Sequence, residues 1–350
     1  MGKRNPAQVT LRDIAEATGY TVNTVSHALK DKTDISEQTR ARIQQKAAEM
    51  GYIGNALAGS MRTGRTRTLA LILGDIANPH FALIACDVEQ TARDAGYQTI
   101  LYNTGEDPEA ELVAIHSALA HKADGLLLCP TQQSRRNLHY LKRCGAPFVL
   151  VGRSFDGEML PGTVLDDESG GLLATRLLLA HGHRRILLLD GPGYISSAQL
   201  RRRGYERAFA EQKLTPPPEL ICPVAIEAGC TDPLAAIDPA HTPFSAIFAF
   251  SDMVALEAAA ALQRRGLRVP EDVSIVGCDN IQAEFPVPVP LTSVCSAGES
   301  MAQSAARQLI ALLMGIPQTK KILPVQLMLR DSVRDFSKKS FLCSDGTILL

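Results

Sequence analysis

Short apolar runs alternate with helix-length segments along most of this 350-residue chain. Runs of about four to six apolar residues are typical of strands buried on both faces of a parallel sheet, and the segments between them can supply the covering helices. The order strand, helix, strand therefore predicts a doubly wound α/β fold. We expect strands at 69–73, 99–102, 125–128, 148–151, 186–189, 246–250 and 273–276, and helices at 80–95, 108–121, 133–144, 168–181, 197–212, 251–265 and 299–314.

This alternating array is long enough to form two lobes. We expect the first lobe to end near residues 153–162 and the second to begin near Gly182. The late runs 291–294 and 323–329 would return the chain across the lobes. Because ligands bind at the carboxyl ends of parallel strands, a cleft between two facing lobes is the expected ligand site.

The N-terminal segment before this array reads as two short helices joined by a tight turn. Thr10 can cap the first helix together with Asp13 in a capping box, and Gly19 can end it in the left-handed conformation. Thr21 can cap the second helix, and a third amphipathic helix follows from Ser36. The second helix is expected to point four short side chains outward: Val22, Asn23, Ser26 and His27. This arrangement is typical of a helix-turn-helix that reads base edges in the major groove of DNA, although an arbitrary small helical bundle is the alternative.

Charge is divided unevenly along the chain. Residues 1–67 contain 11 Lys and Arg against 6 Asp and Glu, whereas the rest contains 25 against 31. A basic head on a mildly acidic body suits a phosphate-binding module carried by a separate domain.

The eight cysteines are scattered without a C-x-x-C pair, so we expect reduced, buried thiols and no metal site. The sequence contains neither an apolar export signal nor a run of about 20 apolar residues, so we expect a cytoplasmic protein without membrane contact.

A glycine- and arginine-rich segment, residues 54–67, links the head to the body. Its composition allows two structures. One is a solvated linker. The other is a short helix from Asn55 to Met61 that forms against DNA, where the arginines meet phosphate. Composition favours neither.

Taken together, these motifs resemble the LacI/GalR family of bacterial transcriptional regulators over residues 9 to about 333. The matching motifs are 9–19, 24–26, 35–40 and 50–55 in the head, and 75–79, 181–183, 201–205, 251–256, 269–277 and 279 in the body. The resemblance implies a DNA-binding domain at 1–53, a hinge at 54–67, a two-lobed effector-binding and dimerisation domain at 68–333 and a tail at 334–350. It also implies a homodimeric repressor that binds a palindromic operator and is controlled by a small effector of the sugar or sugar-derivative class.

The family resemblance also implies which residues contact DNA. They are Thr10, Thr21, Val22, Asn23, Thr24, Ser26, His27, Asn55, Ala58 and Met61. Three departures from the family pattern matter. His27 replaces the usual Arg, which shortens the reach to guanine. Gly59 and Met61 alter the hinge helix, although Met61 still suits an apolar wedge between base steps. Gly152 stands where Asp is common, which would leave Arg153 without that neighbour.

The same resemblance places the effector site at the cleft. Arg201 and Asp279 are the leading candidates, because a guanidinium fork and a carboxylate suit a polyhydroxylated or carboxylated small molecule. The alternative is an interlobe ion pair without a ligand. Weaker candidates come from strand-end loops: Asp75, Phe81, Asp166 and Ser251.

Two other classes of protein share parts of this pattern. A binding protein of the periplasmic type has the two-lobed body but would need an export signal and has no use for a basic head. A doubly wound enzyme would need a phosphate loop or a nucleophile with its base. Gly191-Pro-Gly193 follows a strand, but Pro192 lacks an amide donor and position 196 is serine, so a dinucleotide site is not expected. We therefore expect no catalysis and no cofactor.

Overall fold

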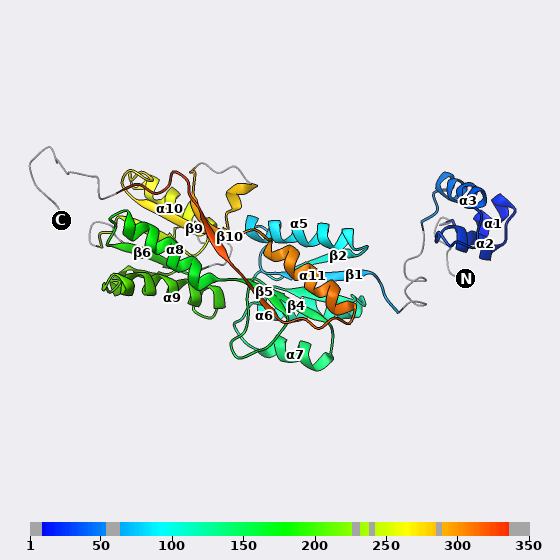
Figure 1. Ribbon diagram of the computed structural model, residues 1–350, viewed down its shortest axis with the longest axis horizontal. Helices are drawn as coiled ribbons and strands as arrows, with labels where there is room; N and C mark the ends of the chain where they lie inside the picture. The colour runs from blue at the N-terminus through cyan, green and yellow to red at the C-terminus, as the bar shows by residue number, and fades with distance from the viewer. Residues whose placement is uncertain (1–8, 54–63, 226–231, 238–241, 285–288, 336–350) are drawn as a thin grey trace, which may run out of the picture. The chain divides into compact units, whose positions relative to one another are not determined.

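The structure of the protein, a computed structural model, describes residues 9–53, 64–225, 232–237, 242–284 and 289–335. The chain divides into two compact units, Met1–Thr66 and Arg67–Leu350. The described part of the first unit is a three-helix head, and the second unit is a two-lobed α/β body (Figure 1). Each unit is described by itself below.

The head consists of α1 (Leu11–Thr18), α2 (Val22–Ala28) and α3 (Glu37–Glu49). The predicted capping box is present, since the Asp13 amide donates to Thr10 Oγ1 and the Thr10 amide donates to Asp13 Oδ2. Gly19 ends α1 with a φ of 75°, as its position predicts. The three helices enclose a small apolar core: Ile14, Ala15, Val25, Ala28, Ile43 and Ala47.

The first lobe of the body contains a six-stranded sheet in the order β11-β5-β4-β3-β1-β2, all pairs of which are parallel. Its strands are β1 (Thr68–Leu73), β2 (Gln98–Asn103), β3 (Gly125–Leu128), β4 (Phe148–Val151), β5 (Gly162–Leu165) and β11 (Lys320–Leu323). Its helices are α5 (Pro79–Asp94), α6 (Pro108–Ala120), α7 (Arg136–Cys144) and α11 (Met301–Leu313). One face of the sheet packs against α5 and α11, and the other against α6 and α7.

The second lobe repeats this plan with the order β12-β10-β9-β8-β6-β7, in which only β12 runs antiparallel to its neighbour. Its strands are β6 (Ile186–Asp190), β7 (Ile221–Pro223), β8 (Ala246–Ala249), β9 (Ser274–Cys278), β10 (Thr292–Ser296) and β12 (Val325–Met328). Its helices are α8 (Asp167–Ala180), α9 (Ser196–Glu211) and α10 (Asp252–Arg264), with short 3-10 turns at Pro218–Leu220 and Ile281–Ala283. The sheet is covered by α8 and α9 on one face and by α10 on the other.

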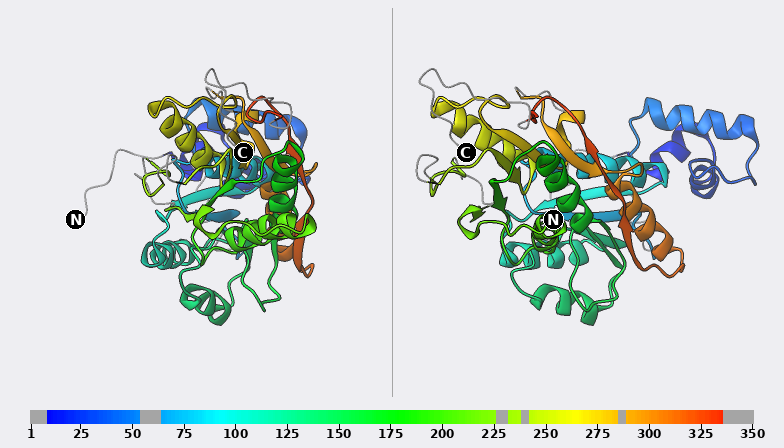
Figure 2. Two further views of the ribbon diagram at one scale, coloured as in Figure 1. Left: turned by 90° about the vertical axis from the view of Figure 1, so that its left-hand side faces the viewer. Right: turned by 60° about the vertical axis from the view of Figure 1, so that its left-hand side comes forward.

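The chain passes between the lobes three times: from β5 to α8, from β10 to α11 and from β11 to β12. Consequently α11 packs in the first lobe although it follows a strand of the second (Figures 1 and 2). The predicted lobe boundary was therefore wrong, because β5 still belongs to the first sheet and α8 already covers the second. The first lobe continues to the end of β5 at Leu165 instead of ending near 153–162, and the second lobe begins with α8 at Asp167 instead of near Gly182. The prediction that 323–329 crosses between the lobes is confirmed.

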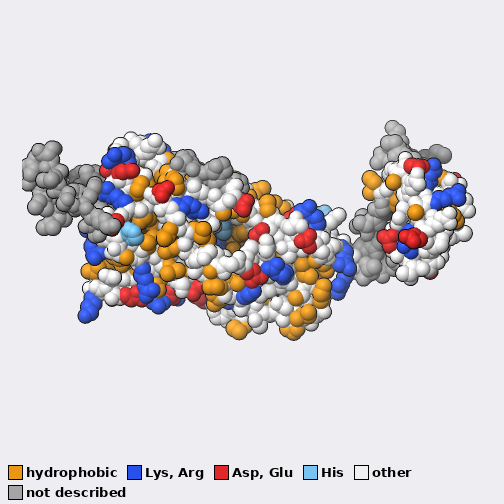
Figure 3. Space-filling view, turned by 45° about the horizontal axis from the view of Figure 1, so that its top comes forward, with side chains coloured by type: hydrophobic (Ala, Val, Ile, Leu, Met, Phe, Trp, Pro, Cys, Tyr) orange, Lys and Arg blue, Asp and Glu red, His pale blue; other side chains and the backbone are white. Residues whose placement is uncertain are grey.

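The predicted strand at 99–102 exists, but it is not buried on both faces. β2 forms an edge of the first sheet and pairs only with β1, so Ile100 and Leu101 are 37% and 41% exposed. Charged side chains of both signs are interspersed over much of the body's surface (Figure 3). Within the part of the chain that the structure describes, no helix combines the length and the hydropathy that crossing a bilayer requires.

Candidate functional site

The predicted reading helix of the head, α2, has the exposure that base recognition requires. Val25 and Ala28 are buried in the head's core, whereas Val22 and Asn23 are exposed. The Thr21 hydroxyl accepts the amide of Thr24 at 3.2 Å and so caps the helix. The side chains expected to face outward thus do so, with Thr24, Ser26 and His27 partly exposed. The small, polar surface of α2 can enter a major groove.

His27 is held in place by a residue that the sequence analysis did not single out. Its Nδ1 lies 2.7 Å from Oδ2 of Asp34, which lies in the turn before α3. This contact fixes the plane of the imidazole and leaves Nε2 as the ring nitrogen available to a partner. Thr10, another expected DNA contact, uses its side chain within the capping box of α1.

The body contains a cavity of about 270 Å³ between the two lobes. It lies at the carboxyl ends of strands from both sheets, where the parallel fold predicts a ligand site. Five of the six predicted effector residues line it: Asp75, Phe81, Arg201, Ser251 and Asp279. Apolar side chains, among them Ile84, Met253 and Met301, form part of its wall.

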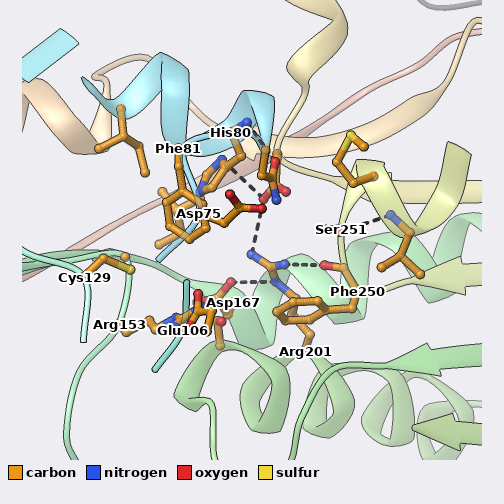
Figure 4. Close-up of a pocket in the computed structure, with 18 of the residues that line it drawn as sticks. Asp75, His80, Phe81, Glu106, Cys129, Arg153, Asp167, Arg201, Phe250 and Ser251 are labelled. Carbon is orange, nitrogen blue, oxygen red and sulfur yellow. Dashed lines mark hydrogen bonds and ion pairs between the residues drawn. The ribbon is translucent and has the colours of Figure 1, made fainter. Parts of the chain in front are cut away.

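Arg201, on the second turn of α9, is held by contacts on every side of its guanidinium group (Figure 4). Its Nε donates to Oδ1 of Asp167 at 2.8 Å, and Nη1 donates to the carbonyl of Phe250. Nη2 lies 3.8 Å from Oδ1 of Asp279. The guanidinium also stacks on the Phe250 ring, 5.1 Å from its centroid. These contacts present a fixed fork of donors to the cavity.

Asp279, in the second lobe, faces a histidine of the first lobe across the cavity. Its Oδ1 lies 3.7 Å from Nδ1 of His80, which comes from α5 of the first lobe. Burial, together with nearby Arg201 and Arg153, lowers the pKa of His80 to about 4, so the imidazole is neutral at neutral pH. Arg201 and Asp279 both belong to the second lobe. Their contact is therefore not the interlobe ion pair that was the alternative to a ligand site.

Asp279 also lies close to a second buried carboxylate, Asp252 at the start of α10. Asp252 accepts the Ser293 hydroxyl at 2.6 Å and the Ile281 amide at 3.0 Å. Burial and the negative charge of Asp279 raise the pKa of Asp252 to about 7. Burial likewise raises the pKa of Asp279, against the effect of Arg201. The two carboxyl groups are therefore partly protonated near neutrality.

Arg153 has no aspartate neighbour at position 152, where the chain has glycine, but another carboxylate pairs with it. Both of its terminal nitrogens donate to Glu106, each at 2.8 Å, and Nη1 also donates to the Pro130 carbonyl at 2.9 Å. Gly152 has a φ of 76°, which disfavours other residues, and a Cβ there would meet the Met301 methyl at 3.4 Å. Glu106, from the loop before α6, supplies the negative charge instead.

Asp166 does not line the cavity, contrary to the prediction that it is one of the effector contacts. Its carboxylate folds back on α8 as an N-cap and accepts the amide of Ser169 at 3.1 Å and its hydroxyl at 2.6 Å. The next residue, Asp167, faces the cavity and contacts Arg201. The sequence places both aspartates at a helix start, and only the helix's orientation decides which one turns inward.

Asp167 and Arg201 meet because α8 and α9 approach unusually closely. A Cβ on Gly171 of α8 would lie 2.1 Å from the Arg201 carbonyl, and one on Gly204 of α9 would lie 2.1 Å from the Glu168 carbonyl. Two glycines therefore let the backbones touch at the point that joins the Asp167 and Arg201 side chains.

The residues of the cavity that sequence reasoning missed include His80, Glu106, Asp167, Phe250 and Glu257. Glu106 follows the predicted strand 99–102 and Phe250 ends the predicted strand 246–250, so position at a strand end could have signalled both residues. His80, Asp167 and Glu257 lie inside helices, and helical periodicity does not show which face borders a cavity. The expected DNA contacts Asn55, Ala58 and Met61 lie outside the described residues, as does Gly59.

Comparison with known proteins agrees with both parts of this geometry. Residues 10–55 match bacterial regulatory proteins of the lacI family, and residues 175–333 match a periplasmic binding protein-like domain. The HTH-type transcriptional regulator DegA of Bacillus subtilis is 31% identical, over 93% of this chain and 98% of its own length. The chain belongs to the lacI family. This lacI-family protein is thus a transcriptional regulator with a DNA-binding head and an effector-binding body.

Two solved structures show how fully the fold is shared with other proteins. A lac repressor dimer bound to operator and the anti-inducer ONPF superposes with a TM-score of 0.80, at 23% identity, over 94% of this chain and 100% of that chain. A complex of the transcriptional regulator CelR with cellobiose gives a TM-score of 0.65 at 28% identity, over 93% and 99%. The lacI-family protein described here therefore shares a head and a two-lobed body with regulators solved on operator DNA and with a sugar.

Proposed function

We propose that this protein is a homodimeric repressor that binds a palindromic operator and that a small polyhydroxylated effector, held in the interlobe cavity, controls this binding. The observation that carries the proposal is the cavity itself, which side chains of both lobes line and which contains the fixed guanidinium group of Arg201. A ligand that contacts both lobes binds one lobe arrangement better than another. It can shift operator affinity by that difference, typically about 1–3 kcal/mol.

The small size of the head is the reason for proposing a dimer. One short α2 reads few base pairs, and two heads related by a two-fold axis would read a palindrome. The exposed apolar residues on the edge strand β2, Ile100 and Leu101, offer surface for such a self-complementary contact.

The CelR complex with cellobiose supports a sugar as the effector class. We further propose that the protein acts in the cytoplasm, where the DNA lies, and has no catalytic activity.

Operator binding is tested first, without knowledge of the effector. Double-stranded DNA selected by the full chain from a random pool should contain a palindrome, and a mobility-shift assay should show its retention at nanomolar protein. Sugars that raise the thermal unfolding temperature are then added to the retained complex. Absence of any selected motif would contradict the proposal.

Arg201→Lys tests the cavity. Lysine keeps the charge but cannot contact Asp167, the Phe250 carbonyl and Asp279 together, because it lacks the planar fork. We expect the sugar concentration needed to change operator binding to rise by about tenfold or more, with operator affinity itself unchanged. Arg203→Lys, on the exposed side of the same helix, is the matched control. An unchanged response of the Arg201 variant would remove the cavity from the proposal.

A further inference from the structure

The cavity of the proposed effector site holds an excess of negative charge. Among its described lining residues there are five carboxyl groups and two guanidinium groups, so negative charge is in excess even though burial raises the pKa of Asp279 and leaves it partly protonated near neutrality. The carboxylates are Asp75, Glu106, Asp167, Glu257 and Asp279, and the guanidinium groups are Arg153 and Arg201. His80 adds no charge near neutral pH, because burial lowers its pKa to about 4.

Both guanidinium groups already have carboxylate partners within the protein. Arg153 makes two 2.8 Å hydrogen bonds to Glu106, and the Arg153 and Glu106 side chains are only 7% and 5% exposed. Arg201 is satisfied by Asp167 and Asp279. An anionic ligand would therefore have to displace a buried carboxylate or lie beside it, and either is costly in a site shielded from water.

The excess of negative charge in the cavity is due largely to Asp75 and Glu257. Asp75 follows β1 in the first lobe, and Glu257 lies on α10 in the second. Both side chains border the cavity and are half-buried, and in the described part of the chain neither forms an ion pair within 4.0 Å. The Asp75 carboxylate accepts the Ala77 amide at 3.0 Å. Each lobe thus contributes a carboxylate whose charge no described cation neutralises.

The rest of the wall suits a compact ring. Phe81, Ile84, Met253, Val254 and Met301 provide an apolar surface on which the C–H face of a sugar can pack. Nη2 of Arg201, which lies 3.8 Å from Oδ1 of Asp279, can donate to ring hydroxyls. The ligand that complements all three features has hydroxyl groups, an apolar face and a positive charge.

We propose that the effector is a positively charged polyhydroxylated compound of the amino-sugar class, with Asp75 and Glu257 accepting its ammonium group. The cavity then discriminates against sugar acids and sugar phosphates. This proposal rests on the cavity being the effector site, and it narrows the ligand class by charge.

Three compounds with the same ring separate charge from shape: glucosamine, glucose and glucuronate. A second set, galactosamine, galactose and galacturonate, varies one hydroxyl. Calorimetry on the full chain, at a pH that keeps the amine protonated, should give an amino sugar a Kd at least about tenfold below that of its neutral parent, with the acid weakest. The double variant D75N/E257Q should lose this preference. The variant E271Q removes an exposed carboxylate outside the cavity lining and should keep it.

Three results would overturn the proposal: a neutral or acidic member binding as tightly as the amino sugar, a preference that survives in D75N/E257Q, or no binding by either set. Operator binding is measured on the same preparation. If a neutral sugar binds and releases the operator, the charge assignment is wrong while the proposed function stands. If no palindrome is bound, the proposed function itself fails.

Discussion

At the scale of single residues, His27 shows how one contact can restrict recognition. Its ring lies on the partly exposed side of α2, which we expect to face DNA, and its Nδ1 is held 2.7 Å from the Asp34 carboxylate. An oriented imidazole offers a partner one nitrogen in one direction, whereas the arginine usual in the family offers a fork. Base preference at this position should therefore depend on Asp34, although Asp34 itself need not touch DNA.

Asp34→Ala frees the ring and should weaken the preference for one base pair in each half-site by up to about 1 kcal/mol. Selection of bound sequences from a random pool measures this preference directly. Removing a negative charge near phosphate also strengthens binding to any DNA. Glu16→Ala, which removes an exposed carboxylate of α1, controls for that effect. The anchoring role is refuted if the Asp34 and Glu16 variants select the same motif as the wild type.

Stability should depend on pH through the buried Asp252 and Asp279. The pKa of Asp252 is raised from an ordinary value of 3.8 to about 7 by burial and by Asp279. Between these two values the folded state keeps a proton that the unfolded state has released, so the free energy of unfolding falls as pH rises through this window. In Asp252→Asn the residue carries no charge, and the fall between pH 5 and pH 8 should shrink by about 1 kcal/mol or more. Urea unfolding across this range measures the slope, and equal slopes would contradict the assignment.

At the scale of elements, the alternation of apolar runs and amphipathic segments predicted each of the seven longer helices of the body, and six of its strands as buried. It failed where local pattern carries no information. The apolar run of β2 reads like a central strand, and only the sheet order makes it an edge. The short β5 and the lobe change at Asp166 could not be foreseen, because the chain's return paths are set by long-range packing.

The cavity was predictable to a similar degree. Strand-end loops identified Asp75, Ser251 and Asp279, because carboxyl ends of parallel strands converge. The pairing of Arg153 with Glu106 joins residues 47 positions apart, and no local signal connects them. Asp166 and Asp167 differ only in which way they face from the start of α8, and this is a property of the folded lobe.

The close approach of α8 and α9 yields a prediction at this scale. Gly204→Ala would place a Cβ 2.1 Å from the Glu168 carbonyl and 2.5 Å from the Leu172 amide nitrogen, so the helices must separate. We expect a loss of about 1–3 kcal/mol in the free energy of unfolding, and a weaker effector response because Arg201 moves away from Asp167. Gly193→Ala, where nothing lies within 4 Å of the added Cβ, should leave both quantities unchanged. A Gly204 variant as stable as the Gly193 control would show that the helices can adjust freely.

At the scale of the whole molecule, the body consists of two lobes that are joined by three crossings and that each have hydrophobic cores of their own. Few polar contacts bridge the lobes near the cavity. The Ser196 amide donates to Gln132 Oε1 at 2.9 Å, the Ser154 amide donates to the Ser196 hydroxyl at 3.1 Å, and His80 faces Asp279. Because these contacts are few, a ligand that touches both lobes can decide which arrangement is populated.

The oligomeric state depends on which segments of the chain can form a contact with a second copy. Residues 334–350 contain no repeated a/d heptads, and about three to four heptads are needed to sustain a coiled coil. We therefore expect that residues 334–350 do not form a coiled coil and that a dimer is held together by the body. Deleting 336–350 should leave the dimer intact in light scattering, whereas Leu101→Glu, which places a charge on the exposed edge of β2, should weaken it. Lys122→Glu, elsewhere on the first lobe's surface, controls for the added charge. A wild-type tetramer that dissociates on deletion of 336–350 would place the assembly contact in the tail instead of on β2.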